Sequence, residues 1–234
     1  MKLVINEKLL KRNKLIGQIT TYSSLAVLAV GLVFAFAKDD LNKMMLSYVA
    51  LIIGFILSQI GIFYTNRYGR TPRLDEIISA NFEKLNSDYT FYVYSSPIPM
   101  LLVGPAALWI PIPITASGKI SYEKGRWHQQ GGGFMMKIFG QEGLGKPDVD
   151  AETYIKALTK HLQTKFGPDY ELPPMKPVLV LMMKNSEIGD AAAAPTPIVK
   201  ADKFRRHIRH EDRQCTNPLS IEALETINNA LQAK

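Results

Sequence analysis

The chain has a single cysteine, Cys215, among its 234 residues. One cysteine cannot form a disulfide within the chain, which excludes a disulfide-stabilised scaffold and agrees with a reducing compartment. Charged residues make up 21% of the chain, yet none occurs in residues 15–37 or 44–66. With 47% hydrophobic residues, the chain is too apolar to be intrinsically disordered. The composition therefore indicates a folded protein with a strongly apolar N-terminal region.

Each of the two charge-free stretches is 23 residues long. A bilayer core of about 30 Å takes about 20 helical residues, so the pattern predicts two transmembrane helices, over about 15–37 and 44–66. Only six residues separate them, which predicts an antiparallel hairpin over 15–66. A cleaved signal peptide is the competing interpretation of the first stretch, but its apolar core is too long and a small-residue cleavage site is missing.

The charges around the hairpin predict its orientation. The basic residues before the first stretch are Lys2, Lys8, Lys11, Arg12 and Lys14, and those after the second are Arg67, Arg70 and Arg73. The link between the stretches has two lysines beside two aspartates. The positive-inside rule then places residues 1–14 and the body, residues 67–234, in the cytoplasm, as in a bacterial inner membrane protein.

Neither stretch contains an acidic or basic side chain at depth, so we interpret the hairpin as an anchor rather than a transport path. Small residues occur on both helices: Gly31 and Ala35 on the first, and Gly54, Ser58 and Gly61 on the second. They would allow close approach of the helices; the equally favoured alternative is that small residues are simply common in membrane spans. The net charge of +7 resides largely in the N-terminal region, since residues 67–234 hold 21 basic and 18 acidic side chains. This distribution weakens a nucleic-acid interpretation based on total charge.

The body reads as one mixed α/β domain with helices on the faces of a mixed sheet. A proline-spaced run from Pro97 to Pro113 predicts an edge strand. The glycine-rich connection 131–147 is interpreted as a loop or lid, and its segment 134–139 as a strand or a docking segment. The predicted helices are 73–86, about 148–165 with Asp148 or Asp150 as cap, 201–210 and 220–232, and the predicted strands are 89–94, 100–103, 108–114, 119–122, 177–183 and 198–199.

The order of these segments resembles the nuclease-related domain (NERD) family over roughly residues 73–232. The residues that carry the resemblance are the run 101–110 with its Gly104-Pro105 turn, then Gly118-Lys119-Ile120 and Gly125-Arg126-Trp127, followed by the later helices and strands. The resemblance implies a restriction-endonuclease-like fold, related to the PD-(D/E)xK nucleases. In those enzymes a carboxylate pair holds a divalent metal.

The chain departs from the family at the catalytic positions. The family's Asp falls on Pro99, and its Glu-x-Lys falls on Ile112 and Ile114. None of the three can ionise, although phosphodiester hydrolysis of this class needs carboxylates to hold the metal. The resemblance therefore implies an inactive nuclease with no catalytic residue, metal or cofactor. The alternative is a membrane-tethered, metal-dependent nuclease whose rearranged site borrows Asp88 or Glu123.

Two other patterns suggest chemistry. Residues 140–146 match the GxxxxGK spacing of a phosphate-binding loop, but Pro147 stands where Mg²⁺ binding requires Ser or Thr. His207 and His210, with Glu211, Asp212 or Cys215 nearby, could hold a metal. The surrounding basic residues would repel that cation, so a solvated basic helix is favoured.

That basic stretch is the strongest surface feature of the body. It consists of Lys200, Lys203, Arg205, Arg206, Arg209 and Arg213. A solvated helix face is the simplest interpretation; anionic lipid or an acidic protein comes next, ahead of nucleic acid, because aromatic residues for base stacking are missing. The sequence as a whole predicts a membrane-anchored, non-catalytic interaction or assembly subunit, as a homo-oligomer or within a larger membrane complex.

Overall fold

The computed structural model describes residues 1–36, 41–131 and 144–232. The chain forms two compact units. Residues Glu7–Arg73 make up the first, which we call the helical unit, and Met1–Asn6 together with Leu74–Lys234 make up the second, which we call the body. The sequence had suggested a body that begins only after the hairpin.

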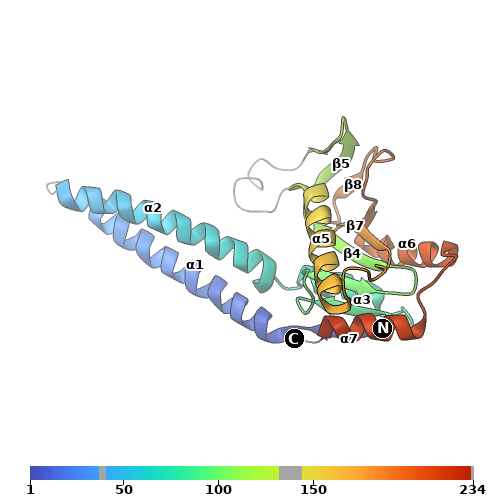
Figure 1. The fold of residues 1–234 in the computed structure, drawn as a ribbon. Helices are drawn as coiled ribbons and strands as arrows, with labels where there is room; N and C mark the ends of the chain where they lie inside the picture. Colours follow the sequence, from blue (N-terminus) through green and yellow to red (C-terminus); the bar gives the residue numbers. More distant parts are fainter. Residues whose placement is uncertain (37–40, 132–143, 233–234) are drawn as a thin grey trace. The chain divides into compact units, whose positions relative to one another are not determined.

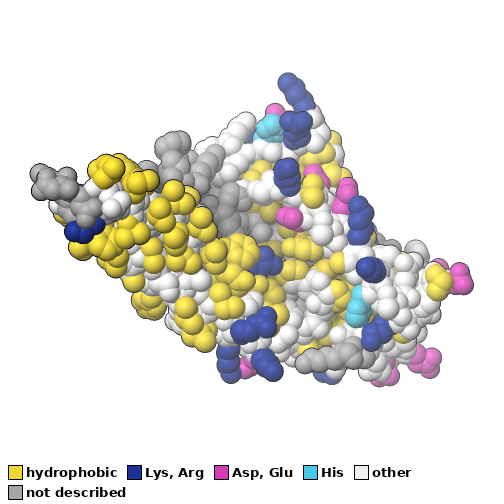
Figure 2. Space-filling view, turned by 60° about the vertical axis from the view of Figure 1, so that its left-hand side comes forward, with side chains coloured by type: hydrophobic (Ala, Val, Ile, Leu, Met, Phe, Trp, Pro, Cys, Tyr) yellow, Lys and Arg dark blue, Asp and Glu magenta, His cyan; other side chains and the backbone are white. Residues whose placement is uncertain are grey.

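The helical unit contains α1 (Glu7–Ala35), α2 (Leu41–Tyr64) and a π-helical turn, η1 (Thr65–Gly69). Both long helices are apolar enough and long enough to cross a membrane. Helix α1 already begins at Glu7, before the charge-free stretch, and the Lys11 ammonium lies 3.2 Å from the Glu7 carboxylate. Figure 2 shows hydrophobic side chains over most of the described surface of these helices in that view.

Helices α1 and α2 meet along small residues that repeat every seven positions. The buried small residues are Gly17, Ser24 and Gly31 on α1, and Ser47, Gly54 and Gly61 on α2. A Cβ added at Gly54 would lie 2.6 Å from the Leu28 side chain, closer than real contacts allow. Ala35, predicted to share the interface with Gly31, is exposed, because the contact period is seven residues rather than four.

The body contains a six-stranded sheet of order β1-β2-β3-β4-β7-β9 and a three-stranded sheet of order β6-β5-β8 (Figure 1). The larger sheet mixes parallel and antiparallel pairs, which confirms the predicted mixed α/β class. The strand bounds are β1 Lys2–Ile5, β2 Thr90–Val93, β3 Met100–Val103, β4 Leu108–Ile114, β5 Gly118–Glu123, β6 Arg126–Gln130, β7 Met175–Leu181, β8 Ser186–Ile188 and β9 Ile198–Lys200.

Helices cover both faces of the six-stranded sheet. On one face, α3 (Leu74–Phe82) and α6 (Ala201–Gln214) pack over a core that includes Trp109. On the other, α5 (Pro147–Phe166) and α7 (Ile221–Gln232) pack over a core that includes Ile110 and Leu158. The structure corrects the predicted cap of α5: its N-cap is Lys146, and Pro147 is the first helical residue, where the missing N–H is not needed.

Strand β1 was not predicted. Lys2–Ile5 pair in parallel with β2, and the Met1 amino group donates to the Leu85 carbonyl over 3.2 Å. The hydrophobic pattern of four residues beside a basic run is too short to signal a strand. Residues Met1–Asn6 therefore belong to the same unit as Leu74–Lys234, and the helical unit lies between them in the sequence.

The proline-rich strand β4 lies inside the sheet rather than at its edge, contrary to the prediction. It pairs with β7 along its whole length, but with β3 only at Leu108 and Trp109. Pro111 and Pro113 fall in the half of β4 that β3 no longer pairs. The sheet therefore loses no backbone hydrogen bond at these prolines, although they have no N–H group.

Candidate functional site

Of the three positions on which the sequence resemblance would place the nuclease motif, two are part of the structural core. Ile112 and Ile114 lie on β4, each only 4% exposed, in the cluster that α5 and α7 cover. Pro99 precedes β3, and its carbonyl accepts a 2.8 Å hydrogen bond from the Tyr94 amide. These three positions therefore supply packing and a turn, with no side chain able to ligate a metal.

The two carboxylates that a rearranged site would borrow belong to different parts of the body. Asp88 is exposed before β2 and accepts a hydrogen bond from Ser87, and Glu123 ends β5 in the smaller sheet and accepts one from Ser121. Among the residues that the structure describes, no group of three or more His, Cys, Asp or Glu side chains could hold a metal ion.

The histidine pair on α6 diverges. The His207 ring packs edge-on against Trp109 with centroids 5.7 Å apart, and burial lowers the pKa of His207. His210 instead lies beside Gln214, with 3.2 Å between their Nε2 atoms. Most of the glycine loop that resembles a phosphate-binding loop, and all of segment 134–139, lie outside the described residues.

Two acidic side chains of α6 face the interior of the body. The Lys176 ammonium, on β7, lies 2.7 Å from the Glu211 carboxylate and holds the pKa of Glu211 below its usual range. The Tyr89 hydroxyl donates to the Asp212 carboxylate. Burial raises the pKa of Asp212, against the opposing effect of this hydrogen bond. Both acids are thereby withdrawn from the outer surface of the helix.

The outer surface of α6 is basic. Four exposed side chains recur at spacings of three and four residues, and we call this set the basic stripe: Lys203, Arg206, Arg209 and Arg213. The other two basic residues of the predicted set, Lys200 and Arg205, are partly buried. Arg209 donates to the Lys84 carbonyl, which ties the stripe to the end of α3. Separating the acids from the bases in this way makes the helix strongly amphipathic in charge as well as in hydrophobicity.

A hollow of about 690 Å³ opens at the C-terminal end of α6. Its lining mixes the Lys176–Glu211 ion pair with Cys215, with amide side chains and with prolines 173 and 174. The Lys176 ammonium also lies 5.4 Å from the centre of the buried Trp109 ring. The indole N–H of Trp109 finds no hydrogen-bond acceptor within the described part of the chain. The charged side chains of the lining, Lys176, Glu171 and Glu211, leave one net negative charge, and the mixed polar and apolar lining favours no single class of ligand.

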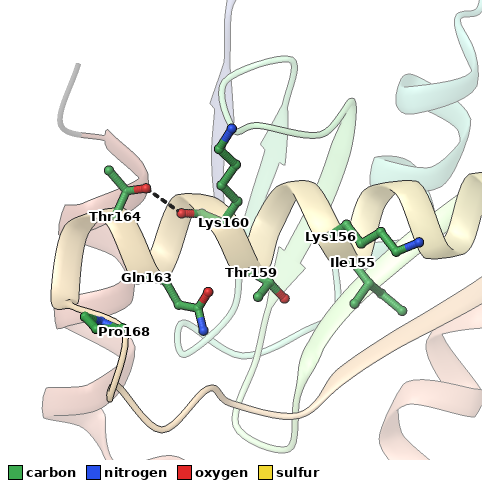
Figure 3. A pocket seen from close by; sticks show the side chains of 7 residues that line it. All are labelled: Ile155, Lys156, Thr159, Lys160, Gln163, Thr164 and Pro168. Carbon is green, nitrogen blue, oxygen red and sulfur yellow. Dashed lines mark hydrogen bonds between the residues drawn. The ribbon is translucent and has the colours of Figure 1, made fainter.

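A second hollow, of about 360 Å³, lies along α5 (Figure 3). Residues of one helix and Pro168 line it, and the Thr164 hydroxyl donates to the Lys160 carbonyl over 2.7 Å. Thr159 points toward β7, with its hydroxyl 3.8 Å from the Met175 sulfur. Lys156 forms an exposed pair with Glu152 at 3.5 Å. Such a shallow helix surface offers no converging groups for catalysis.

Sequence reasoning found the basic residues of α6 but not the side chains that hold the two acids of this helix inward. Tyr89 and Lys176 belong to no motif, and Trp109 stands in the run 101–110 without a predicted role. Trp109 and Lys176 are register partners on the paired strands β4 and β7. The one available signal was the position of Glu211 and Asp212 three and four residues after Ile208, one of two buried side chains of the helix. That spacing places acids toward the core.

The chain was compared with protein-family models, curated proteins and solved structures, and none of them matches it. Along the chain, α3 is followed by β2, β3 and β4, then by the β5–β6 hairpin, α5, β7, β8, β9, α6 and α7. The resemblance to the NERD family therefore stays a prediction, carried by sequence order and residue identity.

Proposed function

We propose that the chain is a membrane-anchored, non-catalytic protein whose NERD-like body acts as an interaction or assembly subunit. The observation that carries this proposal is the burial of Ile112 and Ile114 in the core, at the positions where the family has its Glu-x-Lys. A metal-dependent nuclease would need charged ligands there, and charges introduced at these positions would lack compensation.

The connectivity supports an anchor with both ends on one side of the membrane. Strand β1 and α3 belong to the same compact body, and the helical unit runs between them. A folded sheet cannot be divided by a bilayer, because its backbone groups must remain paired. The basic residues at both ends of the hairpin support the proposal that this side is the cytoplasm, at a bacterial inner membrane.

Two surfaces suit assembly. The helices of the anchor expose apolar side chains around their mutual contact, and the basic stripe is the charged surface of the body. A homo-oligomer or a larger membrane complex would use one or both of them. Nucleic acid is the less favoured partner, because the only Phe, Tyr or Trp of α6, Phe204, is buried.

The proposal is tested by extracting the full chain from membranes in mild detergent and measuring its mass. A discrete mass above that of the 26.2 kDa monomer, as a homo-oligomer or with co-purifying subunits, supports the proposal. A chain that appears in the soluble fraction without detergent, or that is monomeric at all concentrations, contradicts it. The alternative, a membrane-tethered nuclease, would be revealed by metal-dependent cleavage.

A further inference from the structure

We propose that the basic stripe of α6 docks on anionic lipid headgroups and thereby holds the body against the membrane surface. This inference rests on the proposed membrane anchor, and it names the partner of the stripe. The stripe consists of Lys203, Arg206, Arg209 and Arg213, all exposed. Clusters of four or more basic residues close to a membrane bind anionic headgroups.

The chain keeps the body within reach of the bilayer. On the N-terminal side, a single residue, Asn6, separates β1 from α1, and on the other side residues 70–73 separate η1 from α3. Four extended residues reach at most about 14 Å. The basic start of α1, residues 7–14, spans about 12 Å of helix before the charge-free stretch begins. Headgroups extend about 5–7 Å beyond the hydrocarbon core on each side. The body therefore meets the headgroups at a high effective concentration, and a modest surface attraction is enough.

Charge distinguishes α6 from the other helices of the body. Within the described ranges, α6 carries five basic and three acidic side chains, whereas α5 carries three of each. Helices α3 and α7 carry two acidic side chains each and no basic one. An anionic surface attracts α6, is indifferent to α5 and repels the other two.

The interior contacts of α6 strengthen this asymmetry. Glu211 is paired with Lys176, and Asp212 accepts from Tyr89, so two of the three acids are held on the inner side of the helix. Asp202 is the remaining acid, near the N-terminal end, where the helix dipole already favours it. The outward surface from Lys203 to Arg213 is left with positive side chains, which is the arrangement that a flat anionic surface requires.

The experiment uses the full chain in lipid nanodiscs, labelled at its single cysteine, Cys215, which lies directly after α6. A fluorophore at Cys215 is quenched by lipids that carry a nitroxide on the headgroup. We expect stronger quenching in nanodiscs with phosphatidylglycerol than in phosphatidylcholine alone, and loss of the difference in about 1 M salt, where screening acts within about 3 Å.

Two charge-reversal variants distinguish an effect of the basic stripe itself from an effect of the total charge of the protein. K203E/R206E/R213E spares Arg209, which bonds to Lys84, and should lower the ratio of docked to undocked protein by at least about tenfold. K156E/K160E/K165E makes the same charge change on α5 and should leave quenching unchanged. The milder K203Q/R206Q/R213Q, which removes the three charges without reversing them, should give an intermediate loss.

The outcomes separate the two proposals. Equal quenching in both lipid compositions, or equal loss in both reversal variants, overturns the lipid inference and points to an acidic protein as the partner of the stripe. In that case the chain still co-elutes with the nanodisc, and the proposed anchor stands. A chain that fails to incorporate into nanodiscs contradicts the anchor itself.

Discussion

The Lys176 ammonium on β7 lies 2.7 Å from the Glu211 carboxylate on α6. This ion pair joins a strand of the sheet to the helix that covers it, and it turns an acidic side chain of α6 away from solvent. The outer surface of α6 is basic partly because this contact and the Tyr89–Asp212 hydrogen bond lie beneath it.

Replacing Lys176 by Met should reduce the stability of the body by about 0.5–1 kcal/mol at pH 7, because the pair is partly exposed and partly screened. The pKa of Glu211 is lower in the folded state than in the unfolded chain, where it is about 4.3. The ion pair therefore stabilises the folded body fully above that unfolded pKa, and this stabilisation is lost as the pH falls through the pKa of the folded state. The difference in the free energy of unfolding between Lys176→Met and wild type should therefore vanish in acid. The measurement is denaturant unfolding followed by tryptophan fluorescence, since both tryptophans, Trp109 and Trp127, lie in the body.

Lys156→Met is the matched control for that ion pair. Lys156 pairs with Glu152 at 3.5 Å, but their side chains are 78% and 71% exposed. Removing this pair should change stability by less than about 0.5 kcal/mol. Equal effects of the two substitutions would show that the Lys176 contact contributes nothing specific.

The pH dependence expected for Asp212→Asn is opposite to that expected for Lys176→Met: the difference in stability from wild type should appear as the pH rises, not vanish in acid. Burial raises the pKa of Asp212, so the folded state favours the protonated carboxyl, and stability is lost as pH rises from about 3.9 through the folded value. The variant carries no charge to bury and should gain stability relative to wild type between pH 4 and 7. If the difference between the unfolding midpoints of the two proteins stays constant across this range, the raised pKa of Asp212 in the folded state is contradicted.

Gly54→Leu should disrupt the contact between α1 and α2. A Cβ at Gly54 would already lie 2.6 Å from Leu28, and a larger side chain would force the helices apart, at a cost of about 1–3 kcal/mol or more. The measurement is thermal unfolding in detergent, followed by helical circular dichroism. Ala35→Leu, which adds three carbons against four for Gly54→Leu, enlarges an exposed position of α1; it is the control and should be tolerated.

Ile112→Glu should destabilise the body strongly, by about 3 kcal/mol or more, because it buries a charge without a partner. Ile188→Glu is the control, since Ile188 is 41% exposed on β8. If Ile112→Glu unfolds like wild type, the position is open to solvent, and the argument against a metal site there fails.

The sequence predicted the regular elements where their patterns are long. The apolar stripes of α5 and α7 and the apolar run of β7 matched observed elements within a few residues. Strand β1 escaped prediction because four residues beside a basic segment carry no periodic signal, and its partner β2 lies far along the chain. The prolines of β4 led to the wrong prediction of an edge strand. A strand can lie inside a sheet and still lack a neighbour along half of its length on one side.

The candidate site was predictable only in part. The basic residues of α6 stand together in the sequence, so their surface could be inferred from it. The side chains that hold Glu211 and Asp212 inward come from β7 and from the segment before β2. Local patterns cannot show which side chains meet across a fold, and only the three-dimensional arrangement separates acids from bases on this helix.

The most direct test of the non-catalytic body is an assay of phosphodiester cleavage by the full chain in detergent. Single- and double-stranded DNA and RNA are incubated with the purified protein and Mg²⁺ or Mn²⁺, with and without a chelator. We expect no cleavage above the buffer background under any of these conditions. Cleavage that requires the metal and disappears on chelation would contradict the account.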